Sequence, residues 1–320
     1  MQTKSIKKFL QTMVNRILIR SKVLQIVYSF YQNGNGDLNI AEKELLFSLQ
    51  KSYDLYHFLL LLIVDITHLQ QRVIESRKNK LLPTEEDLHP NMKLANNRFA
   101  AQLEGNESLK KYVEERGISW SQDEDFIKSV LNTILKSDIY TEYISATTDD
   151  YETDKEFWRS VFKKIIYDNE PIDEHLEECS IYWNNDIEIE ETFVIKTIKS
   201  FEEKNGEKQP LLPMFRDQDD KVFAIQLLRQ TLLKSELFRK KIKEHLKNWE
   251  AERIANMDLL IMQIALAEIM TFPTIPTTVS LNEYINIAKI YSTPKSASFI
   301  NGILDSIVNE LKKEKILLKE

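Results

Sequence analysis

Apolar residues recur at three- and four-residue steps along most of the chain, which predicts helices rather than strands. The clearest stretch, 276–308, predicts two helices separated by Ser292, Thr293 and Pro294. Ser280 and Glu283 have the spacing of a capping box for the first helix, and Pro294 suits the start of the second. A glycine inside the second helix, Gly302, costs about 1 kcal/mol against alanine, so we expect something to approach its backbone.

Other stretches extend the helical pattern. Residues 251–270 are apolar nearly all round and predict a buried central helix, in which Asp258 needs a partner. Asn39 and Glu42 form a second possible capping box after the NGNGD break at 33–37. A calcium loop at this break is disfavoured, because Leu38 stands where the sharp turn needs glycine. Helices are further expected at 14–32, 41–77, 92–116, 123–147, 154–168, 171–183 and 188–204.

A weak internal repeat links two parts of the chain. The segment from Phe157 to Trp183 matches the segment from Phe223 to Trp249 in length and in several apolar positions. A duplicated helix hairpin would produce this match, and so would helical periodicity alone.

Composition narrows the class of protein. The low counts of 6 Gly and 8 Pro favour long helices, and the single cysteine, Cys179, excludes an internal disulfide. The longest uninterrupted apolar run, 58–64, is too short for a membrane span. Arg16 and Arg20 interrupt the apolar residues near the N-terminus, which argues against a signal peptide. We therefore expect a cytoplasmic, all-α protein with no membrane partner, whose translation begins at Met1 or Met13.

Charge is distributed unevenly along the chain. Residues 1–33 carry six Lys or Arg and no Asp or Glu, and residues 221–320 carry 15 basic and 11 acidic residues. The two ends thus sum to +10, and the middle, 34–220, holds a charge of −17. This split favours a polyanion site on the ends and a protein-facing surface in the middle, unless it is chance clustering.

No pattern in the sequence predicts catalysis. The five histidines lack a paired metal spacing, and there is no glycine-rich phosphate loop or nucleophile elbow. Acidic clusters at Asp149-Asp150 and at 217–220 suit the starts of helices. We expect Cys179 to be a packed residue, and we predict no catalytic residue, no metal site and no cofactor.

The C-terminal stretch carries a dense set of specific residues, namely Val279, Asn282 and Glu283, then Ala288 and Lys289, and then the run Phe299, Ile300, Asn301, Gly302, Ile303, Leu304 and Asp305. In this order they resemble the C-terminal pattern of the NusB family of bacterial transcription antitermination factors. The segment QIALAE at 263–268 is similar to the central helix of that family, and 16–31 is similar to its first helix. The middle of the chain matches nothing in the family pattern.

This resemblance implies an all-α, NusB-like helical bundle enlarged by an inserted helical region. The expected division is an N-terminal extension and first helix at 1–33, an acidic insertion at 34–220 and a helical core at 221–320. The family acts without catalysis. It pairs with NusE, a small ribosomal subunit protein, and holds boxA-type single-stranded RNA in the RNA polymerase antitermination complex during ribosomal RNA transcription.

An RNA-binding face is implied by the same resemblance. Binding of single-stranded RNA needs cations along the backbone and planar groups on which bases stack. The implied residues are Arg16, Arg20, Phe299, Asn301 and Gly302, with Lys22 adding charge and with Lys295 and Ser296 at the neighbouring break. Four of these residues also have a plainer interpretation, since Phe299 suits the core, Asn301 a local cap, and Arg16 and Arg20 a solvated surface.

Two other functions stay open. A helical scaffold that has lost RNA binding would use the acidic middle as its working surface, and salt-sensitive RNA affinity distinguishes it from an RNA-binding factor. An RNA methyltransferase is the second, because a NusB-like domain precedes some of these enzymes. The chain lacks the nucleotide-binding α/β segment that such an enzyme needs.

Overall fold

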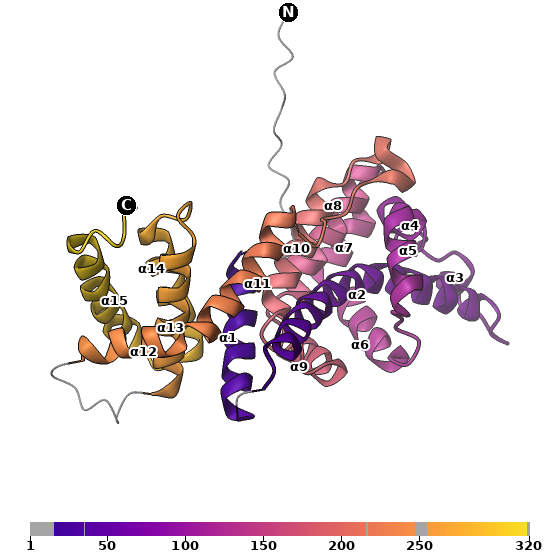
Figure 1. The fold of residues 1–320 in the computed structure, drawn as a ribbon. Helices are drawn as coiled ribbons and strands as arrows, with labels where there is room; N and C mark the ends of the chain where they lie inside the picture. Colours follow the sequence, from indigo (N-terminus) through magenta and orange to yellow (C-terminus); the bar gives the residue numbers. More distant parts are fainter. Residues whose placement is uncertain (1–15, 35, 216, 247–254, 319–320) are drawn as a thin grey trace, which may run out of the picture. The chain divides into compact units, whose positions relative to one another are not determined.

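Every regular element in the described part of the chain is helical, which confirms the all-α prediction (Figure 1). The computed structural model describes residues 16–34, 36–215, 217–246 and 255–318. Its α-helices are α1 (Arg16–Gln32), α2 (Leu38–Lys78), α3 (Glu85–Leu88), α4 (Arg98–Gly105), α5 (Glu107–Arg116), α6 (Glu124–Leu135), α7 (Asp138–Ser145), α8 (Tyr151–Val161), α9 (Glu170–Cys179), α10 (Ile187–Ser200), α11 (Gln218–Leu233), α12 (Ser235–Glu244), α13 (Asn256–Thr271), α14 (Thr277–Tyr291) and α15 (Ser296–Lys313). A π-helix, η1 (Phe162–Ile166), and a 3-10 helix, η2 (Glu203–Lys208), complete them.

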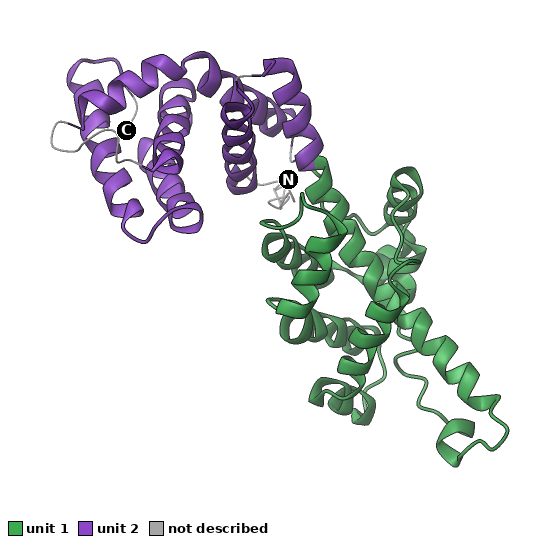
Figure 2. Cartoon of the chain, turned by 90° about the horizontal axis from the view of Figure 1, so that it is seen from below, with its two compact units in different colours: residues 1–13, 50–214 green, residues 14–49, 215–320 purple. Residues whose placement is uncertain are grey.

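The chain divides into two compact units (Figure 2). Unit 1 contains residues 1–13 and 50–214, and unit 2 contains residues 14–49 and 215–320. The sequence places the corresponding boundaries at 33/34 and 220/221. The long helix α2 contributes its first residues, 38–49, to unit 2 and the rest to unit 1.

Helix α13 is the centre of unit 2, as its apolar sequence predicts. It packs against α1, α11, α12, α14 and α15, and its residues from Leu260 to Ile269 are buried. Asp258, near its start, is buried and accepts a hydrogen bond from the Ser292 hydroxyl, so the expected partner is present. The predicted apolar stripe of the last helix, at 297, 300, 304, 307, 308 and 311, is also fully buried.

Unit 1 is built around the apolar middle of α2. The indole nitrogen of Trp120 donates to the Phe58 carbonyl at 2.8 Å, and that of Trp183 donates to the Lys51 carbonyl at 2.8 Å. Helix α2 is long and apolar enough to cross a membrane by length and composition alone. Since 67% of its most apolar window is buried inside the protein, these properties are those of a core helix.

Two predicted helices are each divided in the structure. The expected helix at 92–116 breaks at Asn106, whose side chain accepts from the Leu109 amide and starts α5. The expected helix at 123–147 breaks at Ser137, whose hydroxyl accepts from the Tyr140 amide and starts α7. Asparagine and serine favour such N-terminal positions, because their side chains satisfy amides that have no partner in the helix.

The predicted capping boxes are wrong, and the side chains concerned make tertiary contacts instead. Helix α14 begins at Thr277, so Ser280 lies inside it and donates to Glu268. Asp37, rather than Asn39, accepts from the amide at the start of α2, while Glu42 pairs with Arg229. Pro294 precedes α15, which begins at Ser296. The acidic starts are confirmed, since Asp150 caps α8 and Asp217 caps α11.

The internal repeat has a structural counterpart. Helices α8 and η1 together span 151–166, which matches the length of α11 at 218–233. Helices α9 and α12 both contain 10 residues. The aligned pairs Phe157/Phe223 and Leu176/Ile242 are buried in both hairpins, whereas Trp249 lies outside the described residues. The two hairpins thus agree in helix length as well as in apolar pattern, and they differ by the π-turn of η1.

Candidate nucleic-acid interface

A buried polar network holds three helices of unit 2 together. The Arg20 guanidinium on α1 binds both oxygens of Glu268 on α13, at 2.7 and 2.8 Å. Glu268 also accepts from the hydroxyls of Ser280 and Tyr284 on α14, at 2.7 and 2.9 Å. Arg20 is 3% exposed and Glu268 is fully buried. Burial lowers the pKa of Arg20, but the hydrogen bond and charge of Glu268 outweigh it, so the pKa is raised and the charge is kept.

The basic residues of α1 therefore lie in different surroundings from those the sequence implies. Arg20 and Lys22 are both buried, so neither presents its charge on the surface of the structure. Arg16 is partly exposed, lies 3.3 Å from the Asp220 carboxylate and stacks over the Phe223 ring. The N-terminal lysines 4, 7 and 8 lie outside the described residues.

The turn between α14 and α15 is fixed by hydroxyl groups. Ser292 donates to the buried Asp258, and its hydroxyl oxygen lies 3.0 Å from that of Ser296, which places the two groups within hydrogen-bonding distance. Thr293 and Ser296 share a further hydrogen bond of 2.8 Å. Ser296 is 4% exposed, so within the described residues it orders the turn and offers little surface to a ligand.

The start of α15 carries an exposed set of groups on this rigid turn. Lys295, Asn301 and Gly302 are exposed, and Phe299 is half-buried. A Cβ atom built on Gly302 would meet no atom within 4 Å. The expected close approach to Gly302 is thus not made by the described part of this chain, which leaves room for an external partner.

Helix α1 reaches this same turn through residues that the sequence did not single out. The Gln25 side chain donates to the Tyr291 hydroxyl at the end of α14, at 3.2 Å. Tyr28, one turn further along α1, is 40% exposed and so offers an aromatic ring to solvent. Arg16 lies about 13 Å from Gln25 along the helix axis. The two parts of α1 therefore contact different residues, Asp220 near Arg16 and Tyr291 near Gln25.

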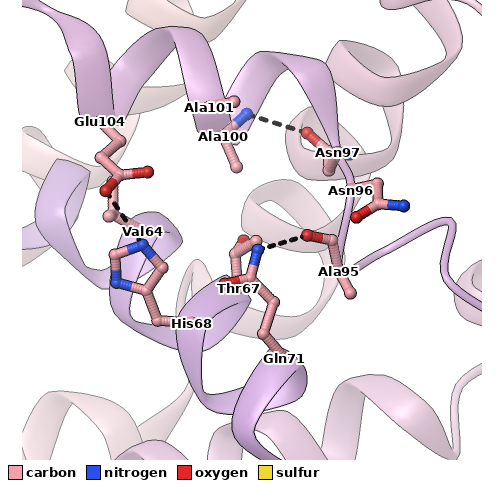
Figure 3. Close-up of a pocket in the computed structure, with 10 residues that line it drawn as sticks. All are labelled: Val64, Thr67, His68, Gln71, Ala95, Asn96, Asn97, Ala100, Ala101 and Glu104. Atoms are coloured by element: carbon pink, nitrogen blue, oxygen red, sulfur yellow. Dashed lines mark hydrogen bonds and ion pairs between the residues drawn. The ribbon is translucent and has the colours of Figure 1, made fainter. Parts of the chain in front are cut away.

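A pocket in unit 1 contains none of the predicted residues (Figure 3). It has a volume of about 280 Å³ between α2, α4 and the turn at 95–97. His68 lies 3.2 Å from Glu104 across its mouth, and Gln71 donates to the Ala95 carbonyl at 2.6 Å. The His68 and Gln71 side chains are thus already paired with other groups of the pocket, and its volume is slightly below the usual range for small-molecule sites.

Comparison with known proteins identifies the C-terminal part of the chain. The model of the NusB family matches residues 185–309. The transcription antitermination protein NusB of Salinibacter ruber is 37% identical over 124 residues, which are 37% of this chain and 78% of that protein. NusB of Thermodesulfovibrio yellowstonii is 38% identical over 118 residues, covering 37% of this chain and 74% of that protein. NusB of Chloroherpeton thalassium is 49% identical over 78 residues, covering 24% of this chain and 37% of that protein. The comparison with solved structures gave no match.

The matched stretch runs from α10 into α15 and lacks only the last residues of α15. It therefore contains Glu268, the α14–α15 turn and the exposed start of α15. It begins at 185, within the region that the sequence assigned to the insertion, and it does not include α1. The likeness of α1 to the first family helix therefore stays a prediction. The chain covers 78% of the Salinibacter ruber protein at 37% identity, and the family model matches residues 185–309. The chain therefore belongs to the NusB family of transcription antitermination proteins.

Proposed function

We propose that this protein is an RNA-binding transcription antitermination factor that acts with NusE on boxA-type RNA during ribosomal RNA transcription. It works in the cytoplasm, within the RNA polymerase antitermination complex, and without catalysis, a cofactor or a membrane. The names of its relatives and the family match support the antitermination role. The RNA sequence and the NusE partnership rest on the resemblance of its C-terminal motifs to the family.

The observation that carries this proposal is the start of α15. Lys295 supplies a cation, Phe299 a ring and Asn301 an amide on one short helical segment, next to the exposed Gly302. Single-stranded RNA is bound by this combination of charge, stacking surface and hydrogen-bonding groups. The turn beneath it is held by the Ser292, Ser296 and Asp258 contacts, so the groups are positioned before RNA arrives.

Arg20 has a supporting role in this proposal. Its guanidinium is engaged by Glu268, so we assign it to positioning α1 against α13 and α14 rather than to RNA contact. Lys22 and Ser296 likewise belong to the buried support, and Arg16 is the partly exposed cation on α1. Tyr28 is a further candidate for base stacking beside the turn.

Replacing Phe299 by leucine should weaken boxA RNA binding about 5- to 150-fold. Leucine keeps apolar bulk for the half-buried position but removes the ring, and stacking of a base on an aromatic ring contributes about 1–3 kcal/mol.

Lys295→Ala should lower RNA affinity and reduce the slope of log affinity against log salt by about 0.7, as expected for one lost phosphate contact. The measurement is a titration of fluorescent boxA RNA at two salt concentrations, with and without purified NusE.

Lys313→Ala is the matched control, because this exposed lysine lies at the opposite end of the same helix. It should leave the affinity nearly unchanged. If wild-type protein fails to bind RNA even with NusE, the scaffold alternative is favoured, with the acidic middle of the chain as the surface to search for a protein partner. A scrambled RNA of the same length tests whether binding depends on sequence.

Gly302→Ala should stabilise the protein by up to about 1 kcal/mol and yet weaken RNA binding. The added methyl group meets no atom of the described chain, and alanine favours the helix over glycine. A ligand backbone that approaches Gly302 closely would collide with that methyl group. Urea denaturation and RNA titration on the same preparation check the two effects, and unchanged RNA affinity would remove Gly302 from the proposed face.

A further inference from the structure

Three metal-ligating side chains from two helices meet on the surface of unit 1. Asp123 precedes α6, and His175 and Cys179 lie four residues apart on one face of α9. One ligand atom from each lies within 4.8 Å of the other two. The His175 Nε2 atom is 3.2 Å from an Asp123 carboxylate oxygen. The set offers an oxygen, a nitrogen and a sulfur donor to one point in space.

Among the described residues, Asp123 makes no capping hydrogen bond and the His175 Nε2 atom makes no hydrogen bond. Asp123 occupies the N-cap position of α6, but its side chain makes no capping hydrogen bond. It lies beside His175 instead of stabilising the helix start. Within the described part of the chain, the His175 Nε2 atom is inaccessible to solvent and has no hydrogen-bond partner, and its 3.2 Å contact with the Asp123 carboxylate is an ion pair only when the imidazole is protonated. A buried ring nitrogen without a hydrogen bond is costly unless another ligand engages it.

The imidazole is held in place by its aromatic neighbours. The His175 ring stacks on Phe126 of α6 with ring centres 3.8 Å apart and an angle of 9° between the planes. The Trp120 ring lies nearly parallel to both, with its centre 5.5 Å from that of Phe126 and 6.2 Å from that of His175. The ring therefore needs little reordering to bind an ion, which is the condition for a preformed site.

We propose that Asp123, His175 and Cys179 bind one zinc ion and thereby fasten α6 to α9. Zinc accepts sulfur, nitrogen and carboxylate ligands in a tetrahedral arrangement, and three protein ligands leave the fourth position to water. The softer thiolate favours zinc over magnesium or calcium, which prefer sets of oxygen ligands. Cys179 is exposed, so an ion can enter from solvent.

The ligand atom of Cys179 is its thiolate sulfur, so binding of the ion displaces the thiol proton. Asp123 binds as a carboxylate and His175 as a neutral imidazole, which completes the three protein ligands.

Titration of metal-free, untagged full-length protein with Zn²⁺ tests the site. We expect one equivalent to bind and the thermal midpoint of unfolding to rise. Cys179→Ser and Asp123→Asn should each weaken this binding at least about 100-fold, since loss of even a supporting partner costs 10- to 100-fold. Because Cys179 is the only cysteine, a thiolate-to-metal absorption band on Co²⁺ substitution reports this site alone.

His68→Ala is the matched control, because His68 in the same unit also lies beside a carboxylate, that of Glu104. It should bind zinc as the wild type does. Circular dichroism confirms that each variant is folded, and Asp123→Asn removes no hydrogen bond that caps α6. Absence of stoichiometric binding in the wild type, or zinc binding that persists unchanged in Cys179→Ser, overturns the proposal.

Discussion

Replacing Glu268 by alanine should lower the free energy of unfolding by about 3–5 kcal/mol. The change leaves the Arg20 guanidinium buried without its carboxylate, and a buried charge that loses its partner is strongly destabilising. Two hydroxyl donors, from Ser280 and Tyr284, lose their acceptor in the same step. Urea denaturation followed by circular dichroism measures the effect.

The size of this loss of stability depends on the burial of the Arg20–Glu268 ion pair. A second, more exposed ion pair in the same unit tests this dependence. Arg229 and Glu42 also form an ion pair within unit 2, but the Arg229 side chain is 45% exposed, so Arg229→Ala should shift the urea midpoint only slightly. The double change Arg20→Met with Glu268→Leu should recover much of the stability, because it removes both buried charges together. A Glu268→Ala midpoint close to that of Arg229→Ala would contradict the central role of this network.

Unit 1 should lose stability as the pH rises from 6.5 to 8. Glu191 is fully buried, and burial, together with Asp173, Asp168 and Glu188, raises its pKa to about 8. The unfolded value is about 4.3, so the folded state binds this proton more tightly. The resulting stability is complete below the unfolded pKa and is lost as the pH rises through about 8, by about 1.5 kcal/mol between pH 6.5 and 8.

The pH window separates Glu191, on α10, from His57, a buried titrating group on α2. Burial lowers the pKa of His57 to about 4, so its effect on stability falls below pH 6.5 and leaves the upper window clear. Glu191→Gln should flatten the dependence between pH 6.5 and 8, whereas Glu114→Gln, on an exposed face of α5, should not. Equal slopes for wild type and Glu191→Gln in urea titrations at the two pH values would refute this assignment.

Periodicity predicted the helices whose apolar faces are long and uninterrupted. The stripe of α15 and the all-round apolar α13 are buried as expected, because their sequence patterns already describe packing on several sides. The breaks at Asn106 and Ser137 were missed because each lies inside an apolar pattern that continues past it. A single capping side chain ends a helix there without changing the period.

The candidate site shows a different limit of the sequence. A guanidinium such as that of Arg20 is read as a surface cation, since nothing nearby in the chain signals its burial. Its partner Glu268 lies 248 positions away, and only the fold brings the two together. The same holds for Asp123, whose distance in sequence from His175 and Cys179 conceals their cluster. Local motifs could propose Lys295, Phe299 and Asn301 together, because these residues lie close to one another at the start of α15.

The long separation of Arg20 from Glu268 has a consequence for biogenesis. Helix α1 leaves the ribosome early, but α13 is made 248 residues later, which takes on the order of 10–50 s at usual rates of synthesis. During that interval the apolar side of α1 has no completed core to join, while residues 50–214 can already collapse into their own unit. The apolar side of α1 therefore stays exposed on the nascent chain until α13 is made. We expect a cotranslational chaperone to bind α1 during this interval.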